Sequence, residues 1–188
     1  MPWARVGAFR KIPRLYFIHP HCNDSDPNTT HEFMSRIAHK HVIFLARDPR
    51  RVVFTYFFRL RKRIKDPQVS SMSLGEFIRH PDYGIIRIID FLNSWYLAEN
   101  RFKRFLFLRY EGVWQQPEKE IARLLEFLNV PVNLDVLRGV LAETEDITTC
   151  AIEDDSASLS EADLEFMERA SLGLEPGLGY SVLSPGVE

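Results

Sequence analysis

Arg47 and Thr55 are the residues whose types and spacing point most directly to a chemical role. Arg47 follows the apolar run Val42–Leu45 by two positions, and Pro49 then stands where proline favours the first turn of a helix. Thr55 lies about two helical turns further on. A guanidinium binds phosphate through two parallel hydrogen bonds, and a helix N-terminus favours anions. This stretch predicts a phosphate site; the alternative is a structural arginine at a strand end and an ordinary helical threonine.

The elements that must position these residues follow from the hydrophobic pattern. Three short apolar runs are continuous rather than alternating, which is typical of strands covered on both faces. Because the strands alternate with helical patterns, parallel pairing is expected, and the predicted fold class is α/β, with a central parallel sheet flanked by helices. Strands are predicted at 15–18, 42–45 and 105–108, and helices at 29–39, 49–65, 74–79, 84–101, 117–128, 134–141 and 160–170.

Length and composition favour one globular domain. The chain has 188 residues, of which 45% are hydrophobic and 27% charged, so a packed core is expected over 1–188. We expect a polar, acidic loop at 144–158 and a loose tail at 181–188. Ser160 and Asp163 predict a capping box at the start of the last helix.

Charge is distributed unevenly along the chain. The segment 47–65 carries eight Arg or Lys and one Asp, whereas 143–168 carries ten Asp or Glu and no basic residue. This asymmetry indicates either an anion-facing side and a solvated side, or two ordinary exposed helix faces. The net charge of -2 gives no reason to expect nucleic acid or a membrane surface, and the basic run 59–65 is interpreted as a solvated helix end. No apolar run reaches the roughly 20 residues of a membrane span.

Cysteine and histidine usage bears on compartment and metal. Cys22 and Cys150 are the two cysteines, so reduced thiols and a cytoplasmic location are expected. The cluster of His19, His21 and Cys22 is too compact for a usual zinc site, and no metal is expected. Residues 1–14 lack the apolar segment of a signal peptide.

The stretch from Val42 to Phe57 resembles the sulfotransferase signature, in which a strand runs into Arg-Asn/Asp-Pro and a Ser or Thr follows eight positions after the arginine. The resemblance implies a P-loop nucleoside-triphosphatase-like sulfotransferase fold and 3′-phosphoadenosine 5′-phosphosulfate (PAPS) as co-substrate. It also implies that Arg47 and Thr55 bind the 3′-phosphate. The segments 105–111 and 116–128 are similar to the family's strand, its Tyr-Glu-Asp element and the helix after it, which implies that Tyr110 lies near the adenosine.

The family resemblance extends upstream to a catalytic base. Pro13–His19 is similar to the strand that ends in the family's Lys-Thr-His, although Phe17 and Ile18 replace the lysine and threonine. This match implies that His19 deprotonates a hydroxyl or amine of a small-molecule or carbohydrate acceptor, with His21 as the alternative imidazole.

Three departures from the family pattern accompany these matches. Gly112 stands where the family has an acidic residue, and acidic residues occupy 144–160, where its Arg-Lys-Gly element is expected. The family's phosphosulfate loop would precede Pro13, and the twelve residues there contain none, which predicts an N-terminally incomplete domain. Two alternatives stay open. One is an impaired remnant that binds adenosine 3′,5′-bisphosphate or a protein partner. The other is a kinase-like transferase, for which the chain offers no Walker loop.

Overall fold

The computed structural model describes residue 15 and residues 27–64, 67–144 and 159–180. The chain divides into two compact units, one of Met1–His19 and Gly112–Thr149, and the other of Pro20–Glu111 and Cys150–Glu188. Apart from Leu15, the strand predicted at 15–18 lies outside the described residues. The same holds for most of the predicted acidic loop and for the predicted tail.

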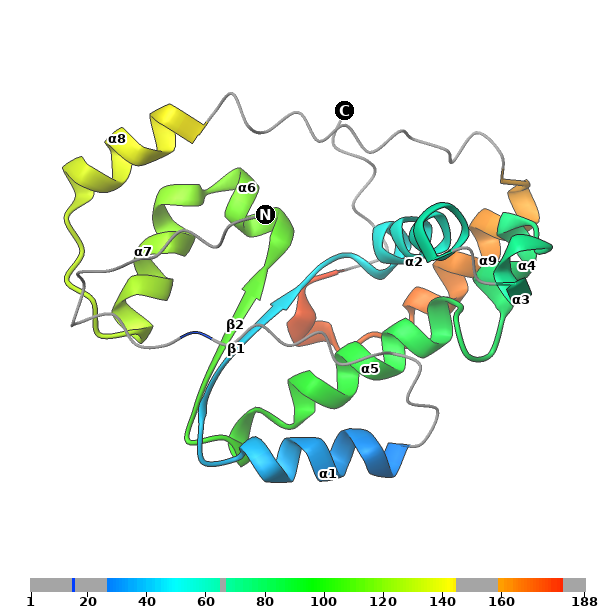
Figure 1. Ribbon diagram of the computed structural model, residues 1–188, viewed down its shortest axis with the longest axis horizontal. Coiled ribbons are helices and arrows are strands. Elements are labelled where there is room, and N and C mark those ends of the chain that lie inside the picture. Colours follow the sequence, from blue (N-terminus) through cyan, green and yellow to red (C-terminus); the bar gives the residue numbers. More distant parts are fainter. Residues whose placement is uncertain (1–14, 16–26, 65–66, 145–158, 181–188) are drawn as a thin grey trace. The chain divides into compact units, whose positions relative to one another are not determined.

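A parallel pair of strands forms the centre of the second unit. β1 (His41–Ala46) pairs with β2 (Arg104–Arg109) in a register that sets His41 opposite Arg104 and Ala46 opposite Arg109. Figure 1 shows the two strands side by side, with both carboxyl ends at the same edge. The predicted α/β class and its parallel pairing are therefore confirmed. The residues that follow the two strands, Arg47 and Tyr110, are placed as neighbours.

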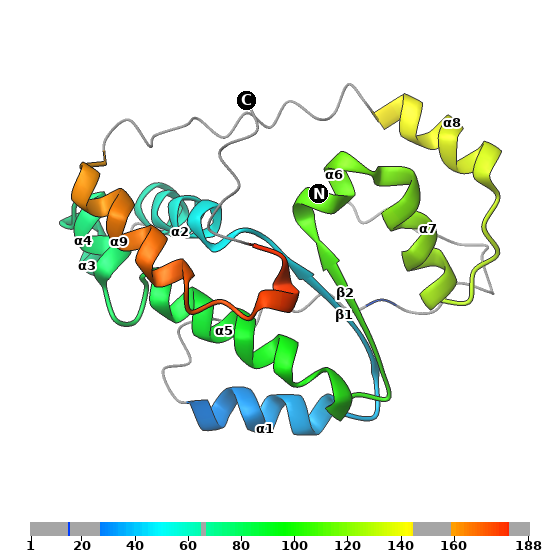
Figure 2. The same ribbon diagram turned by 180° about the vertical axis from the view of Figure 1, so that it is seen from behind.

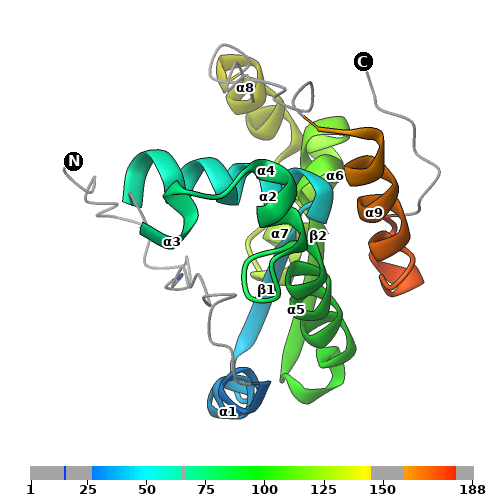
Figure 3. The ribbon, with the colours of Figure 1, turned by 90° about the vertical axis from the view of Figure 1, so that its right-hand side faces the viewer.

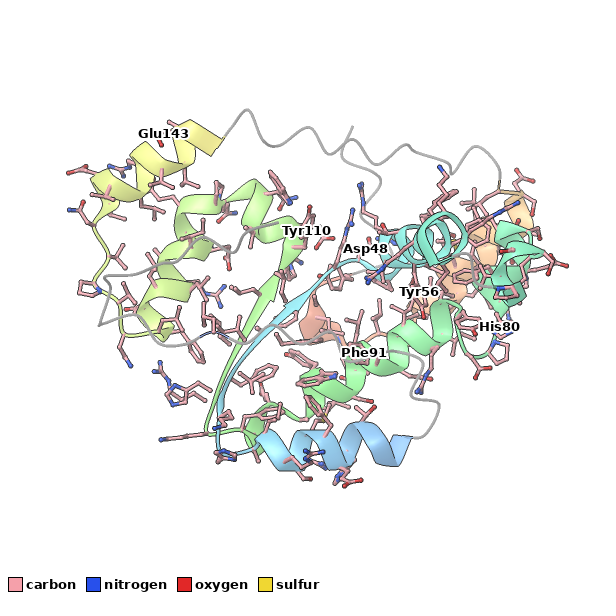
Figure 4. All side chains as sticks on the ribbon, viewed as in Figure 1. Asp48, Tyr56, His80, Phe91, Tyr110 and Glu143 are labelled. Atoms are coloured by element: carbon pink, nitrogen blue, oxygen red, sulfur yellow. The ribbon has the colours of Figure 1, made fainter. Side chains whose placement is uncertain are left out.

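One face of this two-stranded sheet packs against α5 (Ile85–Leu97). The Phe44 ring stacks on Trp95 with 5.5 Å between centroids, and it also lies 6.3 Å from Phe91. Figure 4 shows Phe91 on α5. Leu45, which points to the opposite face of β1, is 55% exposed. The prediction that β1 is covered on both faces is wrong at this position, because a run of apolar residues does not reveal which neighbours will cover it.

Helices pack on α5 from several directions. Its buried residues recur at helical spacing, so one stripe of the helix faces the core. Figure 2 shows α9 alongside α5, and Figure 3 shows β1, β2 and α5 running together. The unit's other elements are α1 (Pro27–Ile37), α2 (Pro49–Phe58), a π-helical stretch (Arg59–Ile64), α3 (Pro67–Ser70), α4 (Leu74–Arg79), two 3₁₀ turns (Glu99–Arg101 and Pro176–Leu178) and α9 (Glu161–Ser171).

One predicted helix differs from the structure in its helix type. The helix predicted at 49–65 is α-helical only to Phe58 and continues as the π-helical stretch. The helical pattern of the sequence does not distinguish an α-helical turn from a π-helical one, so the change of helix type could not be predicted.

The capping box predicted for the last helix is confirmed. The Ser160 hydroxyl accepts a hydrogen bond from the Asp163 amide, and the Asp163 carboxylate accepts one from the Ser160 amide. Asp163 also forms an ion pair with Arg79 of α4. The hydrogen bonds from Ser160, followed by the one from Arg79, lower the pKa of Asp163 to about 2. This carboxylate therefore fastens α9 to α4.

The described residues of the first unit are mainly helical. α6 (Tyr110–Gln115) starts directly after β2, with its first two residues in the second unit, and leads into α7 (Pro117–Phe127), which packs on α8 (Leu134–Thr144). The Arg138 guanidinium of α8 binds the Glu118 carboxylate of α7 through two hydrogen bonds of 2.9 Å. No helix among the described ranges of the chain is long and apolar enough to cross a membrane.

Two glycines give a direct test of this packing. A Cβ at Gly84, which caps α5, would clash with the carbonyl oxygens of Ile78 and His80. A Cβ at Gly139, within α8, would meet no atom of the described residues within 4 Å. We expect Gly84→Ala to lower the free energy of unfolding by about 1–3 kcal/mol. Gly139→Ala should raise it by about 0.5–1 kcal/mol, because alanine is the better helix former.

Urea unfolding followed by circular dichroism measures both changes, and Gly139→Ala serves as the matched control for adding a methyl group. If Gly84→Ala proves as stable as the unaltered protein, Gly84 does not lie as close to the carbonyl oxygens of Ile78 and His80 as the structure shows.

Candidate functional site

Arg47 and Tyr110 meet at the carboxyl edge of the two strands. Arg47 and Tyr110 each come directly after Ala46 and Arg109, the last pair of the strand register. The guanidinium carbon of Arg47 lies over the Tyr110 ring, 4.8 Å from its centroid. Figure 4 shows Tyr110 and Asp48 at this edge. Open α/β sheets place ligands at the carboxyl ends of their strands, and the cation–π contact holds the arginine in one orientation there.

The Nε–H of Arg47 lacks a hydrogen-bond partner among the described residues, although the atom is buried. Buried donors in folded proteins are nearly always satisfied, and one that is left unsatisfied costs about 1–3 kcal/mol. The Arg47 residue as a whole is only partly buried, so an acceptor bound against the guanidinium can satisfy this donor once the Nε–H is uncovered. Arg47 is therefore the residue of this site best arranged to receive an anion.

Asp48 organises the turn that follows Arg47. It is the N-cap of α2, and its Oδ1 accepts hydrogen bonds from the backbone amide and the Nε of Arg50, each at 2.9 Å. Its Oδ2 accepts from Nη2 of Arg50 at 2.6 Å. The hydrogen bond to Asp48 raises the pKa of Arg50 above its ordinary value. Because this carboxylate pairs with Arg50, Arg50 is less available to an anion at the turn than Arg47 is.

The amides of the first turn of α2 are already bonded. The Arg50 amide donates to the Asp48 side chain, and the amides of Arg51 and Val52 donate to the Asp48 carbonyl. The sequence predicts that this helix N-terminus helps to bind the anion, but the cap already uses its amides. An anion at this edge is therefore bound mainly by side chains.

Thr55 lies on the exposed side of α2, and its hydroxyl donates a hydrogen bond to the Arg51 carbonyl at 3.0 Å. No hydrogen bond joins Thr55 to Arg47 in the part of the chain that the structure describes. To donate to a phosphate, the hydroxyl must rotate away from Arg51, whereas its oxygen can accept without any change. Such bonding to the carbonyl four residues earlier is common for threonine within helices.

Two residues at the site, Glu111 and Tyr180, lie in segments that resemble the family, but the sequence assigned no site role to them. Oε1 of Glu111 accepts a hydrogen bond from the Asp48 amide at 2.9 Å, so it joins the ends of the two strands. The Tyr180 hydroxyl is buried near Glu111. The contact of Glu111 joins residues 63 positions apart, and only the register of the strands could have revealed it.

The predicted base, His19, and its alternative, His21, lie outside the described residues, as do both cysteines. Within the ranges that the structure describes, no three His, Cys, Asp or Glu side chains come together as metal ligands. The sequence predictions that can be placed are therefore Arg47 and Tyr110, which the fold brings together, and Thr55, which lies two helical turns further along α2.

Comparison with known proteins identifies the family. The sulfotransferase domain profile matches residues 6–151, which include both strands and the Arg47 edge. The chain belongs to the sulfotransferase domain family. No solved structure gives a significant match.

Curated relatives carry the same family name. The chain is 29% identical over 108 residues to sulfotransferase 2B1 of Mus musculus, an alignment that covers 55% of this chain and 30% of the relative. It is 27% identical over 154 residues to sulfotransferase 2B1 of Homo sapiens, covering 76% of this chain and 39% of the relative. The chain thus spans about a third of the length of the curated relatives that it matches.

The cap of α2 is open to a direct test. Asp48→Ala removes the acceptor for the Arg50 amide, and we expect the free energy of unfolding to fall by about 1–2 kcal/mol. Asp48→Asn keeps a good N-cap and loses only the ion pair to Arg50, so the expected loss is below about 1 kcal/mol. Urea unfolding of both variants measures the difference. Equal losses in the two variants would show that the ion pair, and not the cap, holds the turn.

Proposed function

We propose that this chain carries the nucleotide 3′-phosphate site of a sulfotransferase that moves a sulfuryl group from PAPS to a hydroxyl or amine acceptor. The observation that carries the proposal is Arg47, which rests on Tyr110 with a buried Nε–H that has no partner among the described residues. Family membership supplies the chemical context, because PAPS is the general donor of sulfotransferases.

Each residue of the site has a proposed part in nucleotide binding. Arg47 binds the 3′-phosphate through Nε and one Nη in two parallel hydrogen bonds. Thr55 adds its hydroxyl from the second turn of α2. Tyr110 contacts the adenosine and keeps Arg47 in place. Arg50 is less available for this role because it already pairs with Asp48.

The proposed reaction is an in-line displacement at sulfur. The acceptor oxygen or nitrogen forms a bond to sulfur as the bond from sulfur to the 5′-phosphate oxygen breaks. The acceptor proton passes to a base, for which His19 is proposed from its place in the sequence, and adenosine 3′,5′-bisphosphate leaves. The scheme needs no metal ion. A small-molecule or carbohydrate acceptor and a cytoplasmic setting complete the proposal.

Nucleotide selectivity tests the role of Arg47. We expect the protein to bind adenosine 3′,5′-bisphosphate more tightly than adenosine 5′-monophosphate. A hydrogen bond to a charged group contributes about 1.5–3 kcal/mol, so Arg47→Ala should weaken bisphosphate binding by roughly 10- to 100-fold and leave monophosphate binding nearly unchanged. Isothermal titration calorimetry gives both dissociation constants. Arg36→Ala, on the exposed surface of α1, controls for the loss of one positive charge.

Equal affinity of the unaltered protein for the two nucleotides would show that it has no site for the 3′-phosphate. Turnover is a separate question, answered by incubating the protein with labelled PAPS and a panel of phenols, amines and sugars. Transfer of label supports the enzyme, whereas selective binding without transfer favours the impaired remnant.

A further inference from the structure

Glu111 connects the two strand ends at the level of the backbone. Its Oε1 accepts a hydrogen bond from the Asp48 amide at 2.9 Å, and that amide belongs to the peptide group that follows Arg47. The bond therefore fixes the chain at the point where β1 turns into α2. A shift of this peptide would move the backbone from which the Arg47 side chain extends.

The second oxygen of Glu111 is buried, and so is the hydroxyl of Tyr180. Neither atom has a hydrogen-bond partner that meets normal geometry within the described ranges. Burial, and then the negative charge of Glu111, raise the pKa of Tyr180, so the hydroxyl stays protonated and remains a donor. Oε2 of Glu111 is an acceptor, and the two neighbouring groups are thus complementary. Because Glu111 also raises the pKa of Tyr180 as a hydrogen-bond acceptor, a small movement is enough to join the two groups.

The segment that carries Tyr180 is anchored independently of Glu111. Nη1 of Arg109 donates to the Gly179 carbonyl at 2.6 Å, and the Arg109 guanidinium lies 5.6 Å from the centroid of the Tyr180 ring. Gly179 has a φ of 70°, in the left-handed region that favours glycine, and a Cβ there would approach Nη1 of Arg109 to 2.6 Å.

The same segment is also tied to α5. The Asn93 side chain donates to the Gly173 carbonyl at 2.7 Å and accepts from the Glu175 amide at 2.9 Å. These bonds hold the start of the segment as Arg109 holds its end. Tyr180 is consequently presented to Glu111 by a fixed piece of backbone rather than by a free chain end.

We infer that Glu111 and Tyr180 are positioning residues for Arg47, acting in the order Tyr180 hydroxyl, Glu111 carboxylate, Asp48 amide and Arg47 backbone. Neither residue needs to touch the nucleotide for this role. The inference rests on the proposed function, because it assigns to these two residues the orientation of the arginine that receives the 3′-phosphate.

The readout must separate positioning from stability. Loss of buried hydrogen bonds lowers the melting temperature in either case, whereas only a positioning role changes the preference for the bisphosphate over the monophosphate. The quantity to measure is therefore the ratio of the two dissociation constants, by isothermal titration calorimetry on the full chain, with the melting temperature recorded alongside.

Glu111→Ala should reduce that ratio by roughly tenfold, because the Asp48 amide loses its acceptor. Glu111→Gln keeps a carbonyl oxygen for that amide and should stay within about twofold of the unaltered protein. Tyr180→Phe should reduce the ratio by about two- to fivefold. In the Glu111→Ala background, Tyr180→Phe should have no further effect, because the hydroxyl acts through Glu111.

Tyr96→Phe is the matched control, since the Tyr96 hydroxyl closely approaches Gly177 of the same segment and is expected to leave the ratio unchanged. If Glu111→Ala fails to fold, Tyr180→Phe and Glu111→Gln still decide the matter. If the unaltered protein prefers the bisphosphate and Tyr180→Phe and Glu111→Ala keep the same preference, the positioning role is wrong and the proposed function stands. Absence of selectivity in the unaltered protein overturns the proposed function as well.

Discussion

The in-register parallel pairing of β1 and β2 is the constraint on which the site depends. It ends both strands at one edge and sets Arg47 beside Tyr110 without any further element. A shift of the strand register by one residue would turn the side chain of Arg47 or of Tyr110 to the other face of the sheet. The stack of Phe44 on Trp95 resists such a shift, because it seats one face of β1 against α5.

Some polar groups at this edge have all their hydrogen bonds within the protein, whereas others do not. Asp48 is saturated by Arg50 and by the amides of the first turn of α2, so neither its carboxylate nor that helix N-terminus presents unused groups. The Arg47 side chain is held by an aromatic ring, which restricts the guanidinium without satisfying its Nε–H. The site therefore has one oriented guanidinium, that of Arg47, and one ion pair, between Asp48 and Arg50. This arrangement favours an anionic ligand over a cationic one.

Local patterns in the sequence are enough to predict part of the site. The strand, turn and proline around Arg47 predicted both the strand end and the helix start, and the family resemblance pointed to Tyr110. The hydrogen bond from the Thr55 hydroxyl to the Arg51 carbonyl is also local, because it joins residues four positions apart in one helix. In contrast, the bond from the Asp48 amide to Glu111 and the placement of Tyr180 depend on chain segments far apart in sequence. Burial of Leu45 was overestimated because apolar character alone does not identify the covering surface.

The proposed site depends on the buried Nε–H of Arg47 forming a hydrogen bond with an anionic acceptor. Nuclear magnetic resonance of arginine Nε–H groups, with the Arg47 signal assigned by its loss in Arg47→Lys, observes this proton directly during a titration with adenosine 3′,5′-bisphosphate. If Arg47 binds the 3′-phosphate, its Nε–H signal moves downfield and exchanges more slowly with water as the nucleotide saturates the protein. An Arg47 signal that stays in place while other resonances shift would contradict it.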